Sequence, residues 1–457
     1  MHLARIEAED ITTQPRSNQR PRRSTARTVY PFALAAVVLA SILGCGNNYR
    51  PVVSAINPVG PAAQPTKYAI VASSPSLTLP GLVTVVDFAG DSVMITANLG
   101  VGPYYLALNP GGNTGYTLNQ DGTVNSFGIV TGTTNPLQTK TVLQTTLLAG
   151  ATPNNILPMS TVSYISEPGR NAIAQLTGTP PALKQELPID QGYTPVYIAG
   201  APAGSRAYAI SKATNGGSGQ VAAIDIASNT ISNRIPVGVG PVYGVMTADG
   251  RRVFVMNQGD GTVTVINSQT NLLDTPAVGG SNPIVVGTAP VWADLVPLRN
   301  ELAVVNAGDG VNPGTLSIIN IPLCSAATLP SNPGCDPNNP VNAVGFGQVL
   351  ANVPVGVNSL MVAVLQDQTN SRAYVLNQAD STVSVVNLTT NSVSSVIPVP
   401  ASLHPTFIAA TSGTPTGKVY VTSPETNTMT IIRTDTDTVD TTIDLQGRGV
   451  QVRVTAP

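Results

Sequence analysis

The sequence has few charged and few aromatic residues. Charged residues make up 10% of the 457 positions and aromatic residues 4%, and there are only two histidines, one tryptophan and three cysteines. Beyond residue 44 the single histidine is His404, which excludes a multi-histidine metal centre. No Cys-x-x-Cys-His stretch is present to attach a c-type haem. We therefore expect neither a metal nor another cofactor.

Positive charge is also scarce in the main part of the chain. Residues 1–44 contain six of the 22 basic residues and three of the 24 acidic ones, so the remainder has 16 against 21, a net charge of −5. A surface that follows a phosphate backbone needs clustered Lys and Arg, and no such cluster occurs beyond residue 44. This composition excludes nucleic acid as a partner.

Turn-forming and strand-forming residues are abundant instead. The chain has 42 Gly and 39 Pro, with runs rich in Val, Thr, Ser and Asn between them. Outside the N-terminal segment no stretch combines a 3.6-residue apolar period with caps and enough length for a helix. Many short strands joined by turns fit this composition, and we predict an all-β protein.

The N-terminal segment resembles an export signal. A stretch with six arginines precedes the apolar run YPFALAAVVLASILGC, which ends at Gly44-Cys45 and is short for a membrane span. Its ending is similar to the bacterial lipobox, which implies removal of residues 1–44, a lipid on Cys45 and a membrane held only through that lipid. An uncleaved anchor helix and ordinary signal cleavage are the alternatives. Residues 45–66 are rich in Pro and Asn and predict an extended tether to a body spanning 67–457.

Cysteine usage agrees with export. Apart from Cys45, the chain has only Cys324 and Cys335, separated by a short loop. An even pair in an oxidising compartment favours a disulfide. A metal site is the alternative, but it needs further ligands, and only Asp336 lies next to the pair.

A repeating unit dominates the rest of the sequence. The stretch RRVFVMNQGDGTVTVINSQTN (251–271) has counterparts near residues 116, 374 and 420. Aligning the aromatic residue of its first strand gives anchors spaced by 48, 48, 44, 46, 49, 71 and 46 residues, and these anchors are Tyr68, Tyr116, Tyr164, Tyr208, Phe254, Ala303, Tyr374 and Tyr420. A period of about 40–50 residues made of short strands indicates a β-propeller with one four-stranded blade per repeat.

The strand order within a repeat predicts how the ring closes. RVFVMNQ is expected to be the second strand, GTVTVINSQTN the third with its turn, and TISNRIPVG the fourth. A Pro-led stretch such as GPVYGVMTADG begins the next blade. Because the body starts on a second-type strand and ends on GRGVQVRVTAP, an inner-type strand, we expect the C-terminal strand to complete the first blade. We predict eight blades, with seven as the alternative, and an insert at about 321–341.

These stretches resemble the YVTN-type β-propeller repeat family, which occurs in bacterial envelope proteins and archaeal surface-layer proteins. KVYVTSPETNTMTIIRTDTDTVDTTIDL and the stretch at 251–271 are the most similar, and the resemblance covers about residues 67–457. It implies a propeller in the cell envelope. It implies little about function, because propellers host many activities.

Acidic residues recur in the expected turns. Asp121-Gly122, Asp260-Gly261 and Asp380-Ser381 stand where a tight hairpin needs residues that tolerate positive φ. Asn residues at 119, 257 and 377 are expected to bond from their side chains to the turn backbone, and Asp435, Asp437 and Asp440 are expected in a solvated turn. The functional alternative is that these turns bind calcium. Each turn supplies only one carboxylate, whereas a calcium site needs several oxygen ligands.

Aromatic side chains recur two residues after the Pro that opens each inner strand. The residues in this position are Tyr105, Asn155, Tyr197, Tyr243, Trp292, Met361 and Phe407. Near the mouth of a central channel they could form a ring that stacks on sugar faces or a planar ligand. Alternatively they fill space between adjacent blades. The candidate ligand-binding residues are thus Tyr105, Tyr197, Tyr243, Trp292 and Phe407, with His404 beside them.

Catalytic motifs are scarce. A Ser-His-Asp triad would have to use His404, and there is no Gly-x-Ser-x-Gly elbow. The pair Asp294 and Asp225 could act as two carboxylates, but their spacing does not bring them together. We expect a monomeric, non-catalytic module, lipid-anchored in the cell envelope, that binds an envelope protein or a polysaccharide. The alternatives are a lactonase-like hydrolase using the channel mouth and a structural surface-layer-like component.

Overall fold

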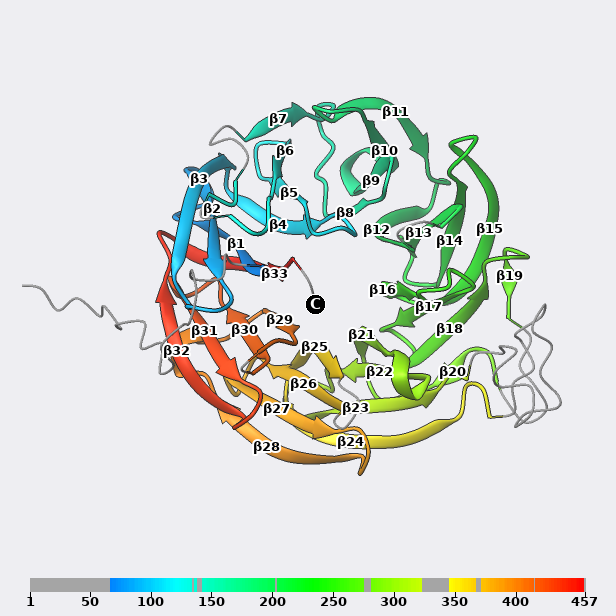
Figure 1. The fold of residues 1–457 in the computed structure, drawn as a ribbon. Helices are drawn as coiled ribbons and strands as arrows, with labels where there is room; N and C mark the ends of the chain where they lie inside the picture. Colours follow the sequence, from blue (N-terminus) through cyan, green and yellow to red (C-terminus); the bar gives the residue numbers. More distant parts are fainter. Residues whose placement is uncertain are drawn as a thin grey trace, which may run out of the picture. The chain divides into compact units, whose positions relative to one another are not determined.

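The protein is all-β, as predicted. The computed structural model describes residues 66–133, 135–137, 142–201, 204–274, 281–322, 345–366, 371–414 and 416–455. They form eight sheets, each one blade, and Figure 1 shows the blades arranged in a ring with one strand of each nearest the centre. This arrangement is an eight-bladed β-propeller, and the alternative of seven blades is wrong.

The first four blades each run from an innermost strand near the centre to an outermost strand. Blade 1 contains β33 (Arg448–Val454), β1 (Tyr68–Ser74), β2 (Pro80–Asp87) and β3 (Val93–Val101). Blade 2 contains β4 (Pro103–Leu108), β5 (Thr114–Asn119), β6 (Thr123–Gly128) and β7 (Leu143–Thr146). Blade 3 contains β8 (Asn155–Pro158), β9 (Val162–Glu167), β10 (Ala172–Thr177) and β11 (Ala182–Pro188). Blade 4 contains β12 (Tyr193–Gly200), β13 (Arg206–Ala213), β14 (Ser218–Asp225) and β15 (Thr230–Val239).

The remaining blades follow the same order. Blade 5 contains β16 (Pro241–Met246), β17 (Arg252–Asn257), β18 (Thr262–Asn267) and a split outer edge of β19 (Leu272–Leu273) and β20 (Ile284–Val285). Blade 6 contains β21 (Pro290–Val296), β22 (Glu301–Asn306), β23 (Pro313–Asn320) and β24 (Val349–Val357). Blade 7 contains β25 (Ser359–Gln366), β26 (Ser371–Asn377), β27 (Thr382–Asn387) and β28 (Ser392–Pro398). Blade 8 contains β29 (Phe407–Thr411), β30 (Lys418–Thr422), β31 (Thr428–Arg433) and β32 (Thr438–Asp444).

Helical structure among the described residues is limited to short 3-10 turns. These are η1 (Pro168–Arg170), η2 (Pro297–Arg299) and η4 (Pro400–Ser402). In the part of the chain that the structure describes, no helix has the length and apolar character needed to cross a membrane. The expectation that strands and turns account for the body is therefore confirmed for these residues.

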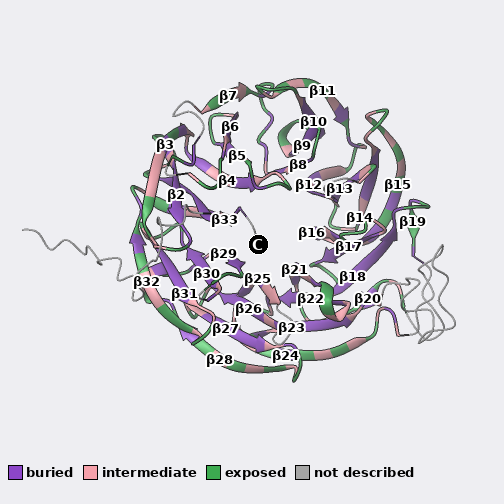
Figure 2. Cartoon of the chain, in the orientation of Figure 1, coloured by how far each residue is buried: buried purple, intermediate pink, exposed green. Residues whose placement is uncertain are grey.

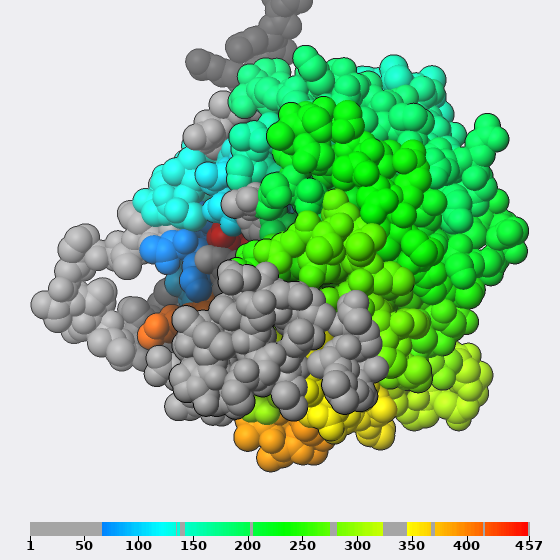
Figure 3. Space-filling view, turned by 90° about the vertical axis from the view of Figure 1, so that its right-hand side faces the viewer, coloured from blue at the N-terminus to red at the C-terminus, as the bar shows by residue number. Residues whose placement is uncertain are grey.

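Burial explains the composition of the strands. The two middle strands of a blade are buried on both faces, as in β17 and β18, where every residue is buried. A strand covered on both sides carries a nearly continuous apolar run. The outermost strand instead alternates, as in β28, which has an exposed residue at every second position. Figure 2 shows the buried middle strands, and Figure 3 shows residues of blades 4 and 5, in green, on one side of the molecule.

The register of the middle strands corrects one repeat anchor. In blade 5 Arg252 pairs with Asn267, and in blade 1 Tyr68 pairs with Asp87, the residue equivalent to Asn267. Tyr68 is therefore the counterpart of Arg252, and Ile70 is the counterpart of Phe254. The alignment of Tyr68 with the other anchors was wrong by two residues. It matched an aromatic residue by type, whereas the position of a residue in a blade is defined by its partner on the neighbouring strand.

The ring closes as predicted. Strand β33 pairs antiparallel with β1, with Ala69 opposite Val454 and Val71 opposite Val452. The last strand thus supplies the innermost strand of blade 1, and the first and last strands of the body lie in one sheet. Closure covers an edge of β1 that would otherwise be free to pair with another chain.

The long connection in blade 6 joins β23 to β24, the third and fourth strands, as predicted. It runs from Ile321 to Gln348, and residues 323–344 within it lie outside the described residues. Cys324 and Cys335 both belong to that stretch. Their disulfide remains a prediction, as do the lipid on Cys45 and the signal and tether, which fall outside the described ranges.

The hairpin turns adopt the predicted backbone. Gly122, Gly261 and Ser381 have φ of 75°, 69° and 50°. The expectation for the Asn side chains was wrong in one respect. Asn257 donates from Nδ2 to the Thr262 and Thr264 hydroxyls at 3.0 and 2.8 Å, so it bonds mainly to side chains of the third strand rather than to the turn backbone.

A contact between blades accounts for the recurrent tyrosine. The Tyr208 hydroxyl of blade 4 donates to Asn271 Oδ1 in the turn between the third and fourth strands of blade 5, at 2.8 Å. Tyr164 donates to Asn229 at 2.6 Å in the same way, and Tyr374 donates to Asp437 at 2.9 Å. We call this contact the tyrosine latch. Because Asp437 also binds Arg372 and is largely buried, its assignment to a solvated turn was wrong.

Candidate functional site

The recurrent aromatic residues occupy one structural position. In blades 2, 4, 5 and 6 a shift of the strand register separates the opening Pro from the aromatic residue two positions later. Tyr197, Tyr243 and Trp292 all follow such a shift in the innermost strand of their blades. These strands surround the centre of the ring (Figure 1).

Four of these rings form a continuous stack across the centre. The Tyr197 and Tyr243 ring centroids are 4.6 Å apart and tilted by 50°. Tyr243 lies over Trp292 at 3.9 Å with 24° between the planes, and Trp292 meets Phe407 edge-on at 6.3 Å and 79°. Aromatic pairs in such arrangements attract by about 0.5–1.5 kcal/mol beyond the area that they bury. We call Tyr197, Tyr243, Trp292 and Phe407 the aromatic stack.

The aromatic stack serves packing and is partly accessible. Phe407 is buried and Tyr243 is nearly so, whereas Tyr197 and Trp292 are half-buried. Trp292 packs against three separate hydrophobic clusters, whose residues come from blades 5 to 8 and blade 1. The rings therefore contact one another in the middle of the propeller. They do not line a channel as separate rings, and they do more than fill the space between two adjacent blades. Whether they bind a ligand stays a prediction.

Tyr105 belongs to a hydrogen-bond chain rather than to the aromatic stack. Its hydroxyl accepts from Asn155 Nδ2 at 2.7 Å, and Asn155 Oδ1 accepts from the Ile198 backbone N–H at 3.0 Å. Asn155 is the counterpart of the aromatic residues in blade 3. The chain thus connects the inner strands of blades 2, 3 and 4, on the side of the ring where Asn replaces an aromatic ring.

The closing strand contributes a cation that the sequence interpretation missed. The guanidinium carbon of Arg453 lies 4.4 Å from the centroid of the Phe407 ring. Its Nε donates to the Leu106 carbonyl at 3.2 Å, and Gln451 Oε1 accepts from the Leu106 N–H at 2.8 Å. Strand β33 therefore binds blades 2 and 8 through its side chains. The repeat pattern predicted that β33 would be an innermost strand. It gave no signal for the contacts of Arg453 and Gln451.

Asp294 is an acidic group that acts electrostatically on Tyr243 of the aromatic stack. It is half-buried on β21, and its two oxygens accept from the Leu295 N–H at 2.9 Å and the Val364 N–H at 2.8 Å. Burial raises the pKa of Asp294 to about 6, although the two N–H groups act in the opposite direction. Burial and the charge of Asp294 together raise the pKa of Tyr243. Asp225, the suggested partner, accepts from Ser228 in a turn at the outer part of blade 4.

His404 lies apart from the aromatic stack. It occupies the connection between blades 7 and 8 with φ of 45°, and its side chain is 46% exposed. Nδ1 is 3.0 Å from Glu425 Oε2, and its backbone N–H donates to the Ser381 hydroxyl. The candidate residues are thus divided into a central group and a surface residue.

The turn carboxylates have structural partners. Asp260 Oδ2 accepts from the Val239 N–H of the preceding blade at 2.8 Å, and Oδ1 accepts from the Thr262 hydroxyl at 2.7 Å. Asp380 accepts similarly from Val357. Within the described ranges no three His, Cys, Asp or Glu side chains are grouped as metal ligands would be. These contacts give the turns a role in joining blades, independent of a cation.

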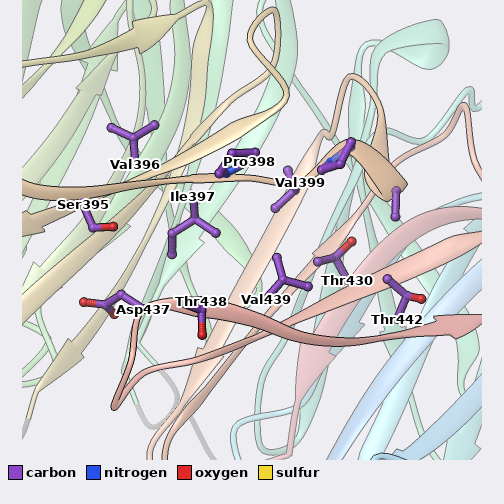
Figure 4. A pocket seen from close by; sticks show the side chains of 12 residues that line it. Ser395, Val396, Ile397, Pro398, Val399, Thr430, Asp437, Thr438, Val439 and Thr442 are labelled. Carbon is purple, nitrogen blue, oxygen red and sulfur yellow. The ribbon is translucent and has the colours of Figure 1, made fainter.

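A groove lies on the outside, between the fourth strands of blades 7 and 8. It has a volume of about 560 Å³ and is lined largely by apolar side chains. Figure 4 shows Ile397 of β28 and Val399, which follows that strand, pointing toward Val439 of β32, with Asp437 at one end. Asp437 is held there by Arg372 and Tyr374, so the tyrosine latch forms one end of the groove.

Fold and site together place this chain in the class of eight-bladed β-propellers whose centre is filled by aromatic side chains. No family model and no curated protein matches the sequence. Solved structures are similar in fold. The dihydro-heme d1 dehydrogenase NirN is 13% identical, with a TM-score of 0.59 over 88% of this chain and 78% of its own.

Two further structures show the same likeness. AztD from Citrobacter koseri is 12% identical, with a TM-score of 0.54 over 85% of this chain and 97% of its own. A Bacteroides fragilis protein assigned as a 6-phosphogluconolactonase is 13% identical, with a TM-score of 0.50 over 86% of this chain and 99% of its own. At these identities the likeness concerns the propeller fold and does not extend to function.

Proposed function

We propose that this chain is a non-catalytic binding module of the cell envelope, held to a membrane by a lipid on Cys45. Its partner is a polysaccharide or a protein that contacts the propeller where the inner strands begin. The resemblance of its repeats to the YVTN type and the lipobox-like ending at Cys45 support the location. The aromatic stack supports the binding role.

The observation that carries the proposal is the position of Tyr197 and Trp292. Both are half-buried members of the aromatic stack and lie on innermost strands. Tyr and Trp rings present large, rigid apolar faces with little conformational entropy to lose, which makes them frequent anchors for ligands. A partner that reaches the centre of this face would meet these rings first.

The test compares two tyrosines on one strand. Tyr197 and Tyr193 are both half-buried on β12, but only Tyr197 has a ring contact in the aromatic stack. Partners of the full-length protein, crosslinked in intact cells, are identified by mass spectrometry for wild type, Tyr197→Ala and Tyr193→Ala. We expect Tyr197→Ala alone to lose the partner while it still unfolds in one cooperative thermal transition, at a lower temperature because a stacking contact is removed. Retention of the same partner by Tyr197→Ala would contradict the proposal.

The lipid is tested separately. Cys45→Ala is expected to abolish incorporation of labelled fatty acid and to release the protein from the membrane fraction, while the melting temperature of the propeller stays the same. Cys324→Ala serves as the control, because it removes another cysteine without affecting the lipobox-like ending. Continued incorporation of fatty acid into Cys45→Ala would disprove a lipid anchor on Cys45. The binding role would then depend only on the crosslinking comparison of Tyr197→Ala and Tyr193→Ala.

A second candidate function, a lactonase-like hydrolase, is favoured by one specific observation. The pKa of Asp294 is raised to about 6, so the group is close to the range in which a carboxylate acts as a base at neutral pH. If the protein hydrolyses lactones, Asp294→Asn should lower the rate by at least about a hundredfold. Equal rates for wild type and Asp294→Asn, measured by the acid released from a lactone panel, would exclude this role for Asp294.

A further inference from the structure

A pocket opens between blades 2 and 3, away from the aromatic stack. It has a volume of about 670 Å³, within the range of pockets that hold small ligands. Blade 2 contributes the second strand with Thr114 and Tyr116, the third strand with Ser126 and Phe127, and Leu143 of β7. Blade 3 contributes the turn between its third and fourth strands, where Thr179 lies.

The pocket lies where the tyrosine latch is missing. Tyr116 is the counterpart of Tyr164 and Tyr208, so its hydroxyl is expected to reach the turn of blade 3. The register of β9 and β10 places Pro181 at the position of Asn271, and Pro181 has no side-chain acceptor. The Asn or Asp side chain that accepts from the tyrosine at three other interfaces is thus absent, and Pro181 lines the pocket.

The blade 3 turn is held in place by another contact. The Thr145 hydroxyl of β7 donates to the Pro181 carbonyl, which joins the outer strand of blade 2 to this turn. Tyr116 is half-buried and near the Ser163 hydroxyl of β9, and burial raises the pKa of Tyr116, so its phenol is neutral at physiological pH. The pocket therefore has fixed walls on both blades and an uncharged phenol.

The lining suits an uncharged ligand with both hydroxyl groups and apolar faces. None of the described residues that line it is Asp, Glu, Lys, Arg or His. The lining includes the hydroxyl-bearing residues Thr114, Ser126 and Thr179 beside the exposed apolar side chains of Val130 and Leu143. An ionic ligand would lose its hydration without gaining a counter-charge here, whereas a neutral sugar offers C–H faces and hydroxyls to match.

We propose that the pocket between blades 2 and 3 binds a neutral saccharide unit, at a site separate from the aromatic stack. The inference goes beyond the proposed function, since it concerns the interface of two blades and not the centre of the ring. A sugar bound there contacts both blades, replaces the missing latch and stabilises their interface.

The test uses cellobiose, maltose and N,N′-diacetylchitobiose as probes, with digalacturonic acid as the charged comparison. Binding to the full-length protein is measured by saturation-transfer NMR and by calorimetry. Leu143→Trp places a large ring at the mouth of the pocket, and Val439→Trp is the matched control. These residues lie on the outer strands β7 and β32 and are 39% and 40% exposed.

We expect at least one neutral disaccharide to bind wild type and Val439→Trp equally and to bind Leu143→Trp about tenfold more weakly or worse. Tyr116→Phe, which keeps the aromatic ring, is expected to weaken binding several-fold. It tests the pocket independently if Leu143→Trp does not fold. The proposal is overturned if no neutral disaccharide binds, if only digalacturonic acid binds, or if neither variant weakens binding. Tyr197→Ala should bind the disaccharide normally, so this result is independent of the proposed function.

Discussion

At the scale of single residues, blades 3 and 5 differ at one buried position. Blade 3 carries Glu167 where blade 5 carries Asn257, and two alanines, Ala172 and Ala174, stand where blade 5 has the threonines that bind the Asn. Glu167 is fully buried, and its carboxylate oxygens have no hydrogen-bond partner among the described residues. Burial, and then the nearby Glu186, raise the pKa of Glu167 to about 8, so the group is protonated at neutral pH.

This position predicts a loss of stability at high pH. A carboxyl whose pKa is raised in the folded state keeps its proton there, so the folded protein loses stability as pH rises from the usual value of 4.5 to about 8. Glu167→Gln cannot ionise. Relative to wild type, it should therefore gain roughly 2–4 kcal/mol in free energy of unfolding between pH 5 and pH 9.

Urea unfolding at several pH values measures this difference. Asp435→Asn is the control, since Asp435 is exposed and its pKa is lowered to about 2 by Arg433, so it does not titrate in this range. A difference between Glu167→Gln and wild type that stays constant from pH 5 to pH 9 would show that Glu167 is ionised throughout.

At the scale of strands and turns, the joints between blades determine which residues recur. The tyrosine of a second strand and the Asn or Asp of the next blade's turn form one unit at three interfaces, whereas the Tyr420 hydroxyl of blade 8 is buried without a hydrogen-bond partner among the described residues. The sequence showed the tyrosine as a recurring residue but not the Asn or Asp that it meets. It could not show that they meet, because they are 63 to 65 residues apart in the chain and approach only through the stacking of blades.

Removing a latch hydroxyl should destabilise the protein. Tyr208→Phe leaves Asn271 Oδ1 buried without its donor, which costs about 1–2 kcal/mol in free energy of unfolding. Tyr116→Phe is the matched control, since blade 3 offers it no Asn or Asp, and its cost should be smaller. Urea denaturation of both variants measures the two costs. An equal loss in the two variants would mean that the latch contributes nothing specific.

For the propeller as a whole, stability depends on the last strand. β33 pairs with β1, and its side chains bind blades 2 and 8 through Leu106 and Phe407. Without β33, blade 1 would lose its innermost strand and β1 would have an unpaired edge. The ring therefore behaves as one cooperative unit rather than as eight independent blades.

Truncation tests this dependence. A chain ending at Leu445 is expected to lose its cooperative thermal transition and to associate, as seen by circular dichroism and light scattering, because the edge of β1 is exposed. Adding a peptide of residues 446–457 should restore the transition and reduce association. A truncated chain that stays monomeric with an unchanged melting temperature would show that closure by β33 is dispensable.

The sequence by itself determined the fold class, the blade count and the closing strand. Turn residues and apolar alternation are local signals, and they recur with a period of about 46 residues. Sheets that repeat in this way cover one another's faces when they are arranged in a ring. The sequence also indicated that Tyr197, Tyr243, Trp292 and Phe407 share one position. In each case the physical cause acts within a single repeat, where sequence patterns are informative.

Only the tertiary structure decided what those positions contact. The aromatic stack, Arg453 over Phe407, the latch between Tyr208 and Asn271, and the pocket where Pro181 replaces an Asn all join residues from different blades. The register error at Tyr68 has the same origin, because a residue's place in a sheet is set by its cross-strand partner. Contacts between blades depend on how neighbouring sheets pack, and a sequence pattern within one repeat contains no information about that packing.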